Sequence, residues 1–159
     1  MQPIAGYNYG AMKLDRLMKV LNLAVVVGTC ITTVGFLVAE FIPEECARLF
    51  TTDEQLIALS VNGLRIMMAA FVFVGSQMVI ANFFQSIGKA KVSMFLSLSR
   101  QMIFLLPMLL LLPLFMGVDG IWWAMPISDL IAECVAVALM AAYMKKFKEQ
   151  HKMIANGEQ

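Results

Sequence analysis

The fold is decided by the stretch VLNLAVVVGTCITTVGFLVAEFI, residues Val20–Ile42, in which Glu40 is the only charged side chain. The hydrocarbon core of a bilayer is about 30 Å thick, and crossing it takes about 20 apolar helical residues. Three more segments are equally long and apolar, and each carries one or two charges: Leu56–Ile87 with Arg65, Val92–Phe115 with Arg100, and Ile121–Tyr143 with Asp129 and Glu133. The sequence therefore predicts an all-α integral membrane protein with four transmembrane helices.

The composition of the whole chain agrees with a membrane protein. Of its 159 residues, 60% are hydrophobic and 14% are charged, and the formal net charge is +1. Soluble domains carry about 25% charged residues. A soluble enzyme, a disordered chain and a nucleic-acid-binding protein are therefore excluded as first interpretations. We expect the lipid bilayer to be the main partner, and no nucleic acid to be bound.

Cysteine and histidine usage argues against metal-dependent or nucleophilic catalysis. The cysteines Cys30, Cys46 and Cys134 are widely spaced, and His151 is the single histidine of the chain. Zinc sites and Ser-His-Asp or Cys-His machinery need closer or more numerous ligands and bases. The phosphate-binding patterns GxxxxGK[ST] and GxGxxG do not occur either. We predict that the protein is not an enzyme and holds no cofactor or metal.

The basic residues between the predicted spans indicate the orientation. One side would carry nine lysines and arginines, namely Lys13, Arg16, Lys19, Lys89, Lys91, Lys145, Lys146, Lys148 and Lys152. The opposite side would carry only Arg48, in the loop Pro43–Gln55, where a short surface helix over Glu44–Phe50 is expected. Basic loops face the cytoplasm, so both termini are predicted to be cytoplasmic.

Charged residues within the spans need partners, because an ionised side chain at mid-membrane costs at least about 2.5–3.5 kcal/mol. At a rise of about 1.5 Å per residue, Arg65 lies level with Asp129, and Arg100 lies level with Glu133. Either these residues form buried ion pairs that hold the helices together, or they line a path for a solute or ion. The uncharged polar residues that share these two interpretations are Gln77, Asn82 and Gln101.

Small residues and prolines within the spans predict close packing and bends. Ala24, Gly28 and Thr32 repeat every four residues, and such faces let helices approach closely in lipid. Pro107 in the third span and Pro126 in the fourth remove backbone hydrogen bonds. We expect bends there, which serve either packing or motion.

The first residues of the chain resemble a signature of the multidrug and toxic compound extrusion (MATE) family. The string QPIAGYNYGA, residues 2–11, is similar to the family motif that closes the second helix of a six-helix lobe. The matching motif residues are Gln2, Pro3, Gly6, Tyr7, Asn8, Tyr9 and Gly10.

Further strings resemble later helices of that family, in the family's order. They are LRI (64–66) and FFQSIGKA (83–90) for the tenth helix, SRQ (99–101) with Pro107 and LP (112–113) for the eleventh, and GVDGIW (117–122) with PISD (126–129) for the twelfth. The resemblance therefore extends over nearly the whole chain.

The resemblance implies a fold of twelve helices in two lobes of six. Residues 1–19 would be the end of the eighth helix and a cytoplasmic loop, residues 20–143 the four-span membrane domain, and residues 144–159 a basic cytoplasmic tail. The N-terminal lobe would be missing, so the chain would be a C-terminal fragment. The complete protein would be a multi-pass exporter in the bacterial inner membrane, which exchanges organic cations or other amphipathic molecules for Na⁺ or H⁺ by alternating access.

One departure distinguishes between branches of the family. The NorM-type branch has a carboxylate in the tenth helix, whereas Leu64–Phe84 contains neither Asp nor Glu. This favours the DinF-like branch, in which the coupling aspartate lies in the N-terminal lobe. Two other interpretations remain open: a lipid-linked sugar flippase of related fold, and a four-span membrane protein that binds partners without transporting.

Overall fold

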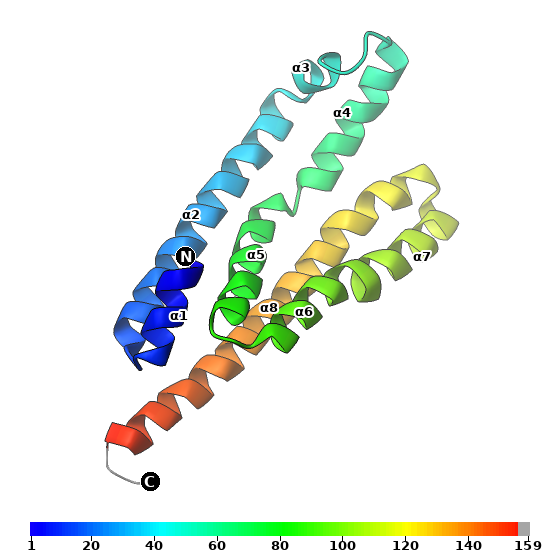
Figure 1. Cartoon of the computed structure of the whole chain (residues 1–159). Coiled ribbons are helices and arrows are strands. Elements are labelled where there is room, and N and C mark those ends of the chain that lie inside the picture. The colour runs from blue at the N-terminus through cyan, green and yellow to red at the C-terminus, as the bar shows by residue number, and fades with distance from the viewer. Residues whose placement is uncertain (156–159) are drawn as a thin grey trace.

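The computed structural model describes residues 1–155, except for the side chains of residues 148 and 150–155, and all secondary structure elements in this part of the chain are helices (Figure 1). In chain order the helices are α1 (Gln2–Gly10), α2 (Leu14–Phe41), α3 (Pro43–Arg48), α4 (Glu54–Met68), α5 (Phe71–Ser86), α6 (Ala90–Leu98), the π-helix η1 (Ser99–Leu105), α7 (Leu106–Met116) and α8 (Val118–Ala155).

Among the described residues, three helical runs are long and apolar enough to cross a membrane, and there are four if one bent pair of helices counts as a single pass. Three are continuous, namely α2, the α6–η1–α7 run and α8, and the fourth is the pair α4 and α5, which is bent by 48°. The predicted all-α membrane fold is therefore confirmed. The helix ends differ from the predicted spans, since α2 begins at Leu14 instead of Val20 and α8 continues to Ala155 instead of ending at Tyr143.

The α2–α5 contact depends on small residues at the crossing point. A Cβ atom on Gly75 would lie 2.5 Å from the Gly28 carbonyl oxygen, so only hydrogen fits there. Next to it, the Thr32 hydroxyl of α2 lies 3.1 Å from the Val72 carbonyl of α5 and equally far from the Gly28 and Thr29 carbonyls of its own helix. The close approach predicted from the small-residue face of α2 is confirmed at Gly28 and Thr32.

The second span is broken in its middle, where the sequence predicted one continuous helix over residues 56–87. At the break the Ala69 N–H donates to Ile66 (3.2 Å) and the Phe73 N–H to Ala70 (3.0 Å), which are bonds to the third preceding residue. These tighter turns redirect the chain by 48°. No proline or glycine occurs between Met67 and Val72, so the usual sequence signals of a bend are absent there.

A π-helical turn interrupts the third span at Ser99–Leu105, immediately before Pro107. Proline has no N–H group, so the Ile103 carbonyl four residues earlier loses its α-helical partner. A turn that bonds to the fifth preceding residue accommodates this loss, and such turns are frequent at functional sites. The third span is thus distorted before Pro107, although the run Ala90–Met116 is continuous, and α8 likewise continues through Pro126. The widened turn carries Arg100 and Gln101.

The connection between α7 and α8 is closed by two glycines. Gly117 adopts a φ of 60°, a conformation that favours glycine. At Gly120 a Cβ atom would lie 2.5 Å from the Leu112 carbonyl, because the backbones of α7 and α8 nearly touch. This hairpin fixes which residues of the third and fourth spans face each other.

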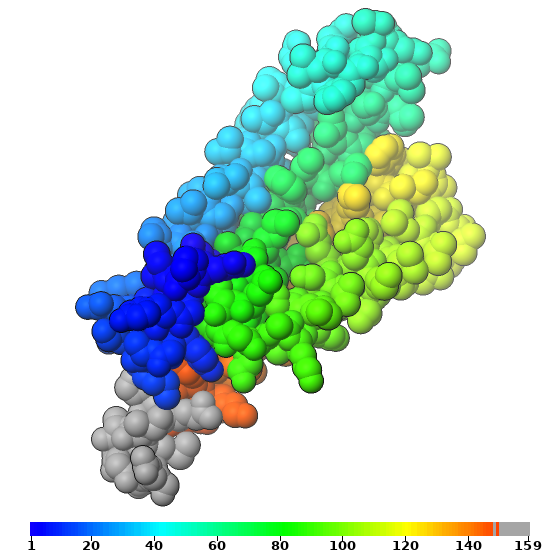
Figure 2. Space-filling view, viewed as in Figure 1, coloured from blue at the N-terminus to red at the C-terminus, as the bar shows by residue number. Residues whose placement is uncertain are grey.

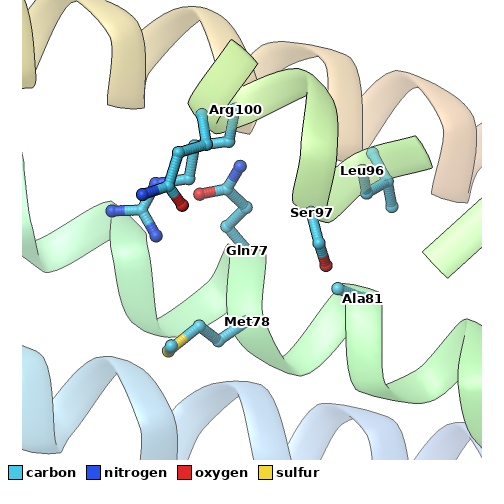
Figure 3. A pocket seen from close by; sticks show the side chains of 7 residues that line it. Gln77, Met78, Ala81, Leu96, Ser97 and Arg100 are labelled. Atoms are coloured by element: carbon cyan, nitrogen blue, oxygen red, sulfur yellow. The ribbon is translucent and has the colours of Figure 1, made fainter. Parts of the chain in front are cut away.

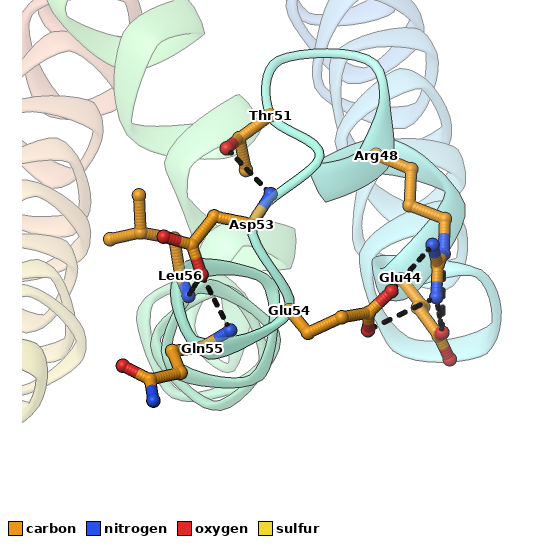
Figure 4. Close-up of polar contacts among 7 residues, drawn as sticks. All are labelled: Glu44, Arg48, Thr51, Asp53, Glu54, Gln55 and Leu56. Carbon is orange, nitrogen blue, oxygen red and sulfur yellow. Dashed lines mark hydrogen bonds and ion pairs between the residues drawn. The ribbon is translucent and has the colours of Figure 1, made fainter.

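Polar contacts order the loop between α3 and α4 (Figure 4). Arg48 binds Glu44 at 2.9 Å and Glu54 at 3.1 Å, and these carboxylates raise the pKa of Arg48. Asp53 caps α4 by accepting from the Gln55 N–H at 2.9 Å. The short surface helix predicted at Glu44–Phe50 is present as α3.

The opposite end of the molecule holds the main apolar cluster. Figure 2 shows the N-terminal segment packed against the α5–α6 region there. Phe84 is fully buried, with its ring 5.3 Å from that of Tyr143, while Tyr9 of α1 stacks on Phe147 of α8 at 5.0 Å. The α1–α2 turn, the α5–α6 turn and the C-terminal part of α8 lie together at this end (Figure 1).

Candidate functional site

An ion pair links the π-helical turn to α8 inside the membrane-spanning region. The Arg100 Nε donates to Asp129 Oδ1 across 2.8 Å. The side chains are 31% and 12% exposed, so water screens the pair only partly. The widened turn at Ser99–Leu105 carries the guanidinium to α8.

The second acidic residue of α8 has a different partner. Ser76 of α5 donates its hydroxyl to Glu133 Oε1 at 2.6 Å. Within the described part of the chain, Glu133 Oε2 is buried without a hydrogen-bond partner, and so is Gln77 Oε1 on the neighbouring residue of α5. Three passes therefore contribute polar side chains to one region, which we call the polar cluster: Ser76, Gln77, Arg100, Gln101, Asp129 and Glu133.

The predicted pairing of Arg65 or Arg100 with Asp129 or Glu133 is confirmed by the Arg100–Asp129 ion pair, whereas the partners expected from depth are wrong. Arg100 binds Asp129 instead of Glu133, and Arg65 reaches the Glu40 carbonyl at 3.4 Å instead of Asp129. The Glu40 carbonyl belongs to the last turn of α2, where cations are favoured by the helix dipole. Depth gives only the position of a residue along the membrane normal. In addition, the π-helical turn and the 48° bend both change the relation between residue number and depth.

Two cavities adjoin the polar cluster and share Arg100 and Gln101. The first, of about 200 Å³, is lined by Gln77, Met78, Ala81, Leu96, Ser97, Arg100 and Gln101 (Figure 3). The second, of about 240 Å³, is lined by Arg100, Gln101, Leu105, Met125 and Asp129. In Figure 3 the Gln77 side chain of α5 points toward Arg100. Four residues of the polar cluster therefore line the cavities, namely Gln77, Arg100, Gln101 and Asp129, whereas Ser76 and Glu133 do not.

The motif residues at the N-terminus lie apart from this cluster and hold α1 against α5. The Gln2 amide contacts Asn82 at 3.5 Å and Gln85 at 3.4 Å. A Cβ atom on Gly6 would lie 3.0 Å from the Ser86 carbonyl. Pro3 lies in the first turn of α1, and the buried Asn8 donates to the Ile4 carbonyl. Tyr9 packs on Phe147. Tyr7 and Gly10 are exposed.

The predicted polar residues thus separate into two groups. Gln77 and Gln101 join Arg100 at the cavities, whereas Asn82 bonds to Met78 and contacts Gln2 at the α1 end. Sequence reasoning missed Ser76, which binds Glu133. The sequence signal that could have identified Ser76 is its position directly before Gln77 in an otherwise apolar span. Among the described residues, no group of three or more His, Cys, Asp or Glu is arranged to hold a metal ion.

Solved structures resemble this chain closely in fold. A chain named "protein A" is 39% identical, with a TM-score of 0.83 over 89% of this chain and 32% of that one. A multidrug resistance MATE family transporter of the MOP superfamily matches in its inward-facing conformation at 19% identity and a TM-score of 0.87, over 93% of this chain and 35% of that one. An outward-facing structure of such a transporter matches at 19% identity and a TM-score of 0.85, over 91% and 33%.

The matches define both the family and the extent of the resemblance. The chain spans about a third of the length of each of these solved structures. No curated protein matches the sequence. The MatE family profile matches residues 1–111, which is more than half of the chain. The protein therefore belongs to the MatE family.

Proposed function

We propose that residues 1–159 form the C-terminal part of a secondary active multidrug exporter that works by alternating access. The main support is that this chain matches an inward-facing and an outward-facing transporter almost equally, with TM-scores of 0.87 and 0.85. A part that keeps its fold in both states can move as one body against the rest of the protein. The N-terminal lobe is the partner that completes the transport path.

We infer that the coupling ion, Na⁺ or H⁺, acts outside this chain, as in the DinF-like branch. No Asp or Glu occurs between Leu56 and Ser86 in α4 and α5, where the NorM-type branch carries one. Asp129 is matched by Arg100, and Glu133 is held by Ser76. The substrate class is an organic cation or another amphipathic small molecule.

Efflux by the complete transporter in proteoliposomes tests this function. Imposed Na⁺ or H⁺ gradients should drive ethidium export, whereas the 159-residue chain alone should export none, since the other lobe is needed to complete the path. Glu133→Gln should keep the gradient dependence. If it abolishes gradient-driven efflux while ethidium exchange and folded yield remain, the coupling group lies in this chain. Flipping of lipid-linked sugars without ethidium efflux would favour the flippase interpretation, and no transport at all would favour the partner-binding one.

The membrane orientation is a second prediction. The turns and the helix end that carry Lys13, Lys89 and Lys145 lie at one end of the molecule, and basic ends face the cytoplasm. In a cysteine-less transporter in the bacterial inner membrane, Thr52→Cys should react with an impermeant thiol reagent from outside. Gly157→Cys, which lies outside the described residues, should react only after permeabilisation. The reverse labelling would contradict cytoplasmic termini.

A further inference from the structure

We propose that the cavity between α5 and the π-helical turn binds the carboxylate of an amphipathic acid, with Arg100 as the anion-binding residue. This inference rests on the proposed transport function, because it assigns a substrate class to that transporter. The named cavity is the one of about 200 Å³ that Gln77, Ser97 and Arg100 line, hereafter the acid pocket.

The guanidinium has donors left for a ligand. Arg100 uses Nε for Asp129, and in the described part of the chain its two terminal nitrogens make no hydrogen bond. Carboxylates bind a guanidinium through two parallel N–H groups, and charge-assisted bonds of this kind are about twice as strong as neutral ones. Asp129 therefore orients the guanidinium without saturating it.

A second observation also points to a missing ligand. Gln77 is only 4% exposed, its amide oxygen is buried, and that oxygen has no partner among the described residues. A buried polar group without a partner costs about 1–3 kcal/mol, so native structures seldom leave one unsatisfied. Figure 3 shows this amide pointing toward Arg100 at the acid pocket. The Gln77 oxygen is an acceptor with almost no accessible surface, so it pairs with an N–H group of a bound acid only when the Gln77 amide turns toward the acid pocket, while the carboxylate of the acid binds the Arg100 nitrogens.

The charge and shape of the lining select the ligand. Arg100 is the only charged residue of the acid pocket, whereas the adjoining cavity is lined by both Arg100 and Asp129, whose charges offset each other. Met78, Ala81 and Leu96 provide an apolar surface for the body of the ligand. Glu133 is bound to Ser76 and is not part of the lining. An amphipathic carboxylate therefore fits this pocket better than an organic cation.

Three dansyl probes that differ in charge test the inference with the complete transporter in phosphatidylcholine nanodiscs. They are dansylglycine, which is an anion, dansylglycinamide, which is neutral, and dansylcadaverine, which is a cation. Fluorescence titration, corrected with empty nanodiscs, should show dansylglycine binding about tenfold more tightly than dansylglycinamide, as expected for hydrogen bonds to a charged group. Equal affinities, or tighter binding of dansylcadaverine, would overturn the proposal.

Variants distinguish a loss of ligand binding in the acid pocket from a loss of the folded protein. The double change Arg100→Gln with Asp129→Asn removes the guanidinium without stranding a charge, and it should abolish the preference for the acid. Gln77→Met should weaken dansylglycine binding severalfold, whereas Gln55→Met, the same change at an exposed residue of α4, should have no effect. A preference that survives the double change would reject Arg100 as the anion-binding residue.

Two further measurements separate this inference from the proposed function and from a lipid ligand. Ethidium efflux without an acid preference would overturn the pocket and leave the exporter in place. An acid preference without efflux would support the pocket and overturn the exporter. Displacement of dansylglycine by added phosphatidylglycerol would assign the site to a lipid headgroup instead of a solute, whereas unchanged binding would support the solute.

Discussion

Replacing Asp129 by Asn in the complete transporter is expected to lower the folded yield severalfold, and replacing Arg100 by Gln should do the same. Each single change leaves one charge of the 2.8 Å pair without its partner in the membrane-spanning region. Breaking buried pairs from one side costs about 3–5 kcal/mol in soluble proteins. Because Arg100 is still 31% exposed, we expect about 1–3 kcal/mol here.

The double variant distinguishes a pair from two independent residues. Arg100→Gln with Asp129→Asn should recover part of the loss, because no charge is then stranded. The measurements are thermal unfolding and monodisperse yield of the purified protein. The control is the exposed pair Arg48–Glu44, whose side chains are 43% and 60% exposed and whose coupling energy should be near zero. Losses that simply add in the Arg100–Asp129 cycle would refute the pairing.

Gly75→Ala should destabilise the protein strongly, by about 1–3 kcal/mol or more. The added methyl would lie 2.5 Å from the Gly28 carbonyl oxygen and 2.6 Å from the Thr32 hydroxyl, and backbone cannot move aside as a side chain can. The α2–α5 crossing would have to open, and the 3.1 Å distance between the Thr32 hydroxyl and the Val72 carbonyl would increase.

Gly35→Ala on α2 is the matched control. Its new methyl would meet only the Phe71 ring, at 3.0 Å, and a ring can turn away. Alanine is also favoured over glycine in a helix by about 1 kcal/mol, which offsets the small clash. The midpoint of thermal unfolding should fall for Gly75→Ala and change little for Gly35→Ala. Similar midpoints for both variants would show that the α2–α5 crossing tolerates separation.

The four membrane-crossing segments could be predicted, because the length of an apolar segment can be read from that segment alone. The cap at Asp53 and the distortion before Pro107 are local as well. The break at Ala69–Ala70 could not be predicted, because the segment carries neither proline nor glycine and so lacks the usual sequence signals of a bend.

In the candidate site, too, the sequence identifies the charged residues better than it identifies their partners. The charged residues were identifiable, because an arginine or carboxylate within an apolar span needs a partner. Their partners were identifiable only for Arg100 and Asp129, since Arg65 contacts a backbone carbonyl and Glu133 a serine. Backbone carbonyls occur at every residue and serines are common in membrane helices, so neither is distinguished by sequence alone.

The π-helical turn also has a consequence for insertions and deletions in this gene. Bonding to the fifth preceding residue places one surplus residue between α6 and α7, which are otherwise parts of one rod. Successive residues of an α-helix are about 100° apart, so a residue lost elsewhere in this span would rotate its two halves by about that angle relative to each other. A residue lost within the widened turn would instead restore α-helical bonding there and keep the relative orientation of α6 and α7. Residues 99–105 should therefore be the part of this span where the loss of one residue disturbs helix packing least, while it shifts Arg100 on its turn.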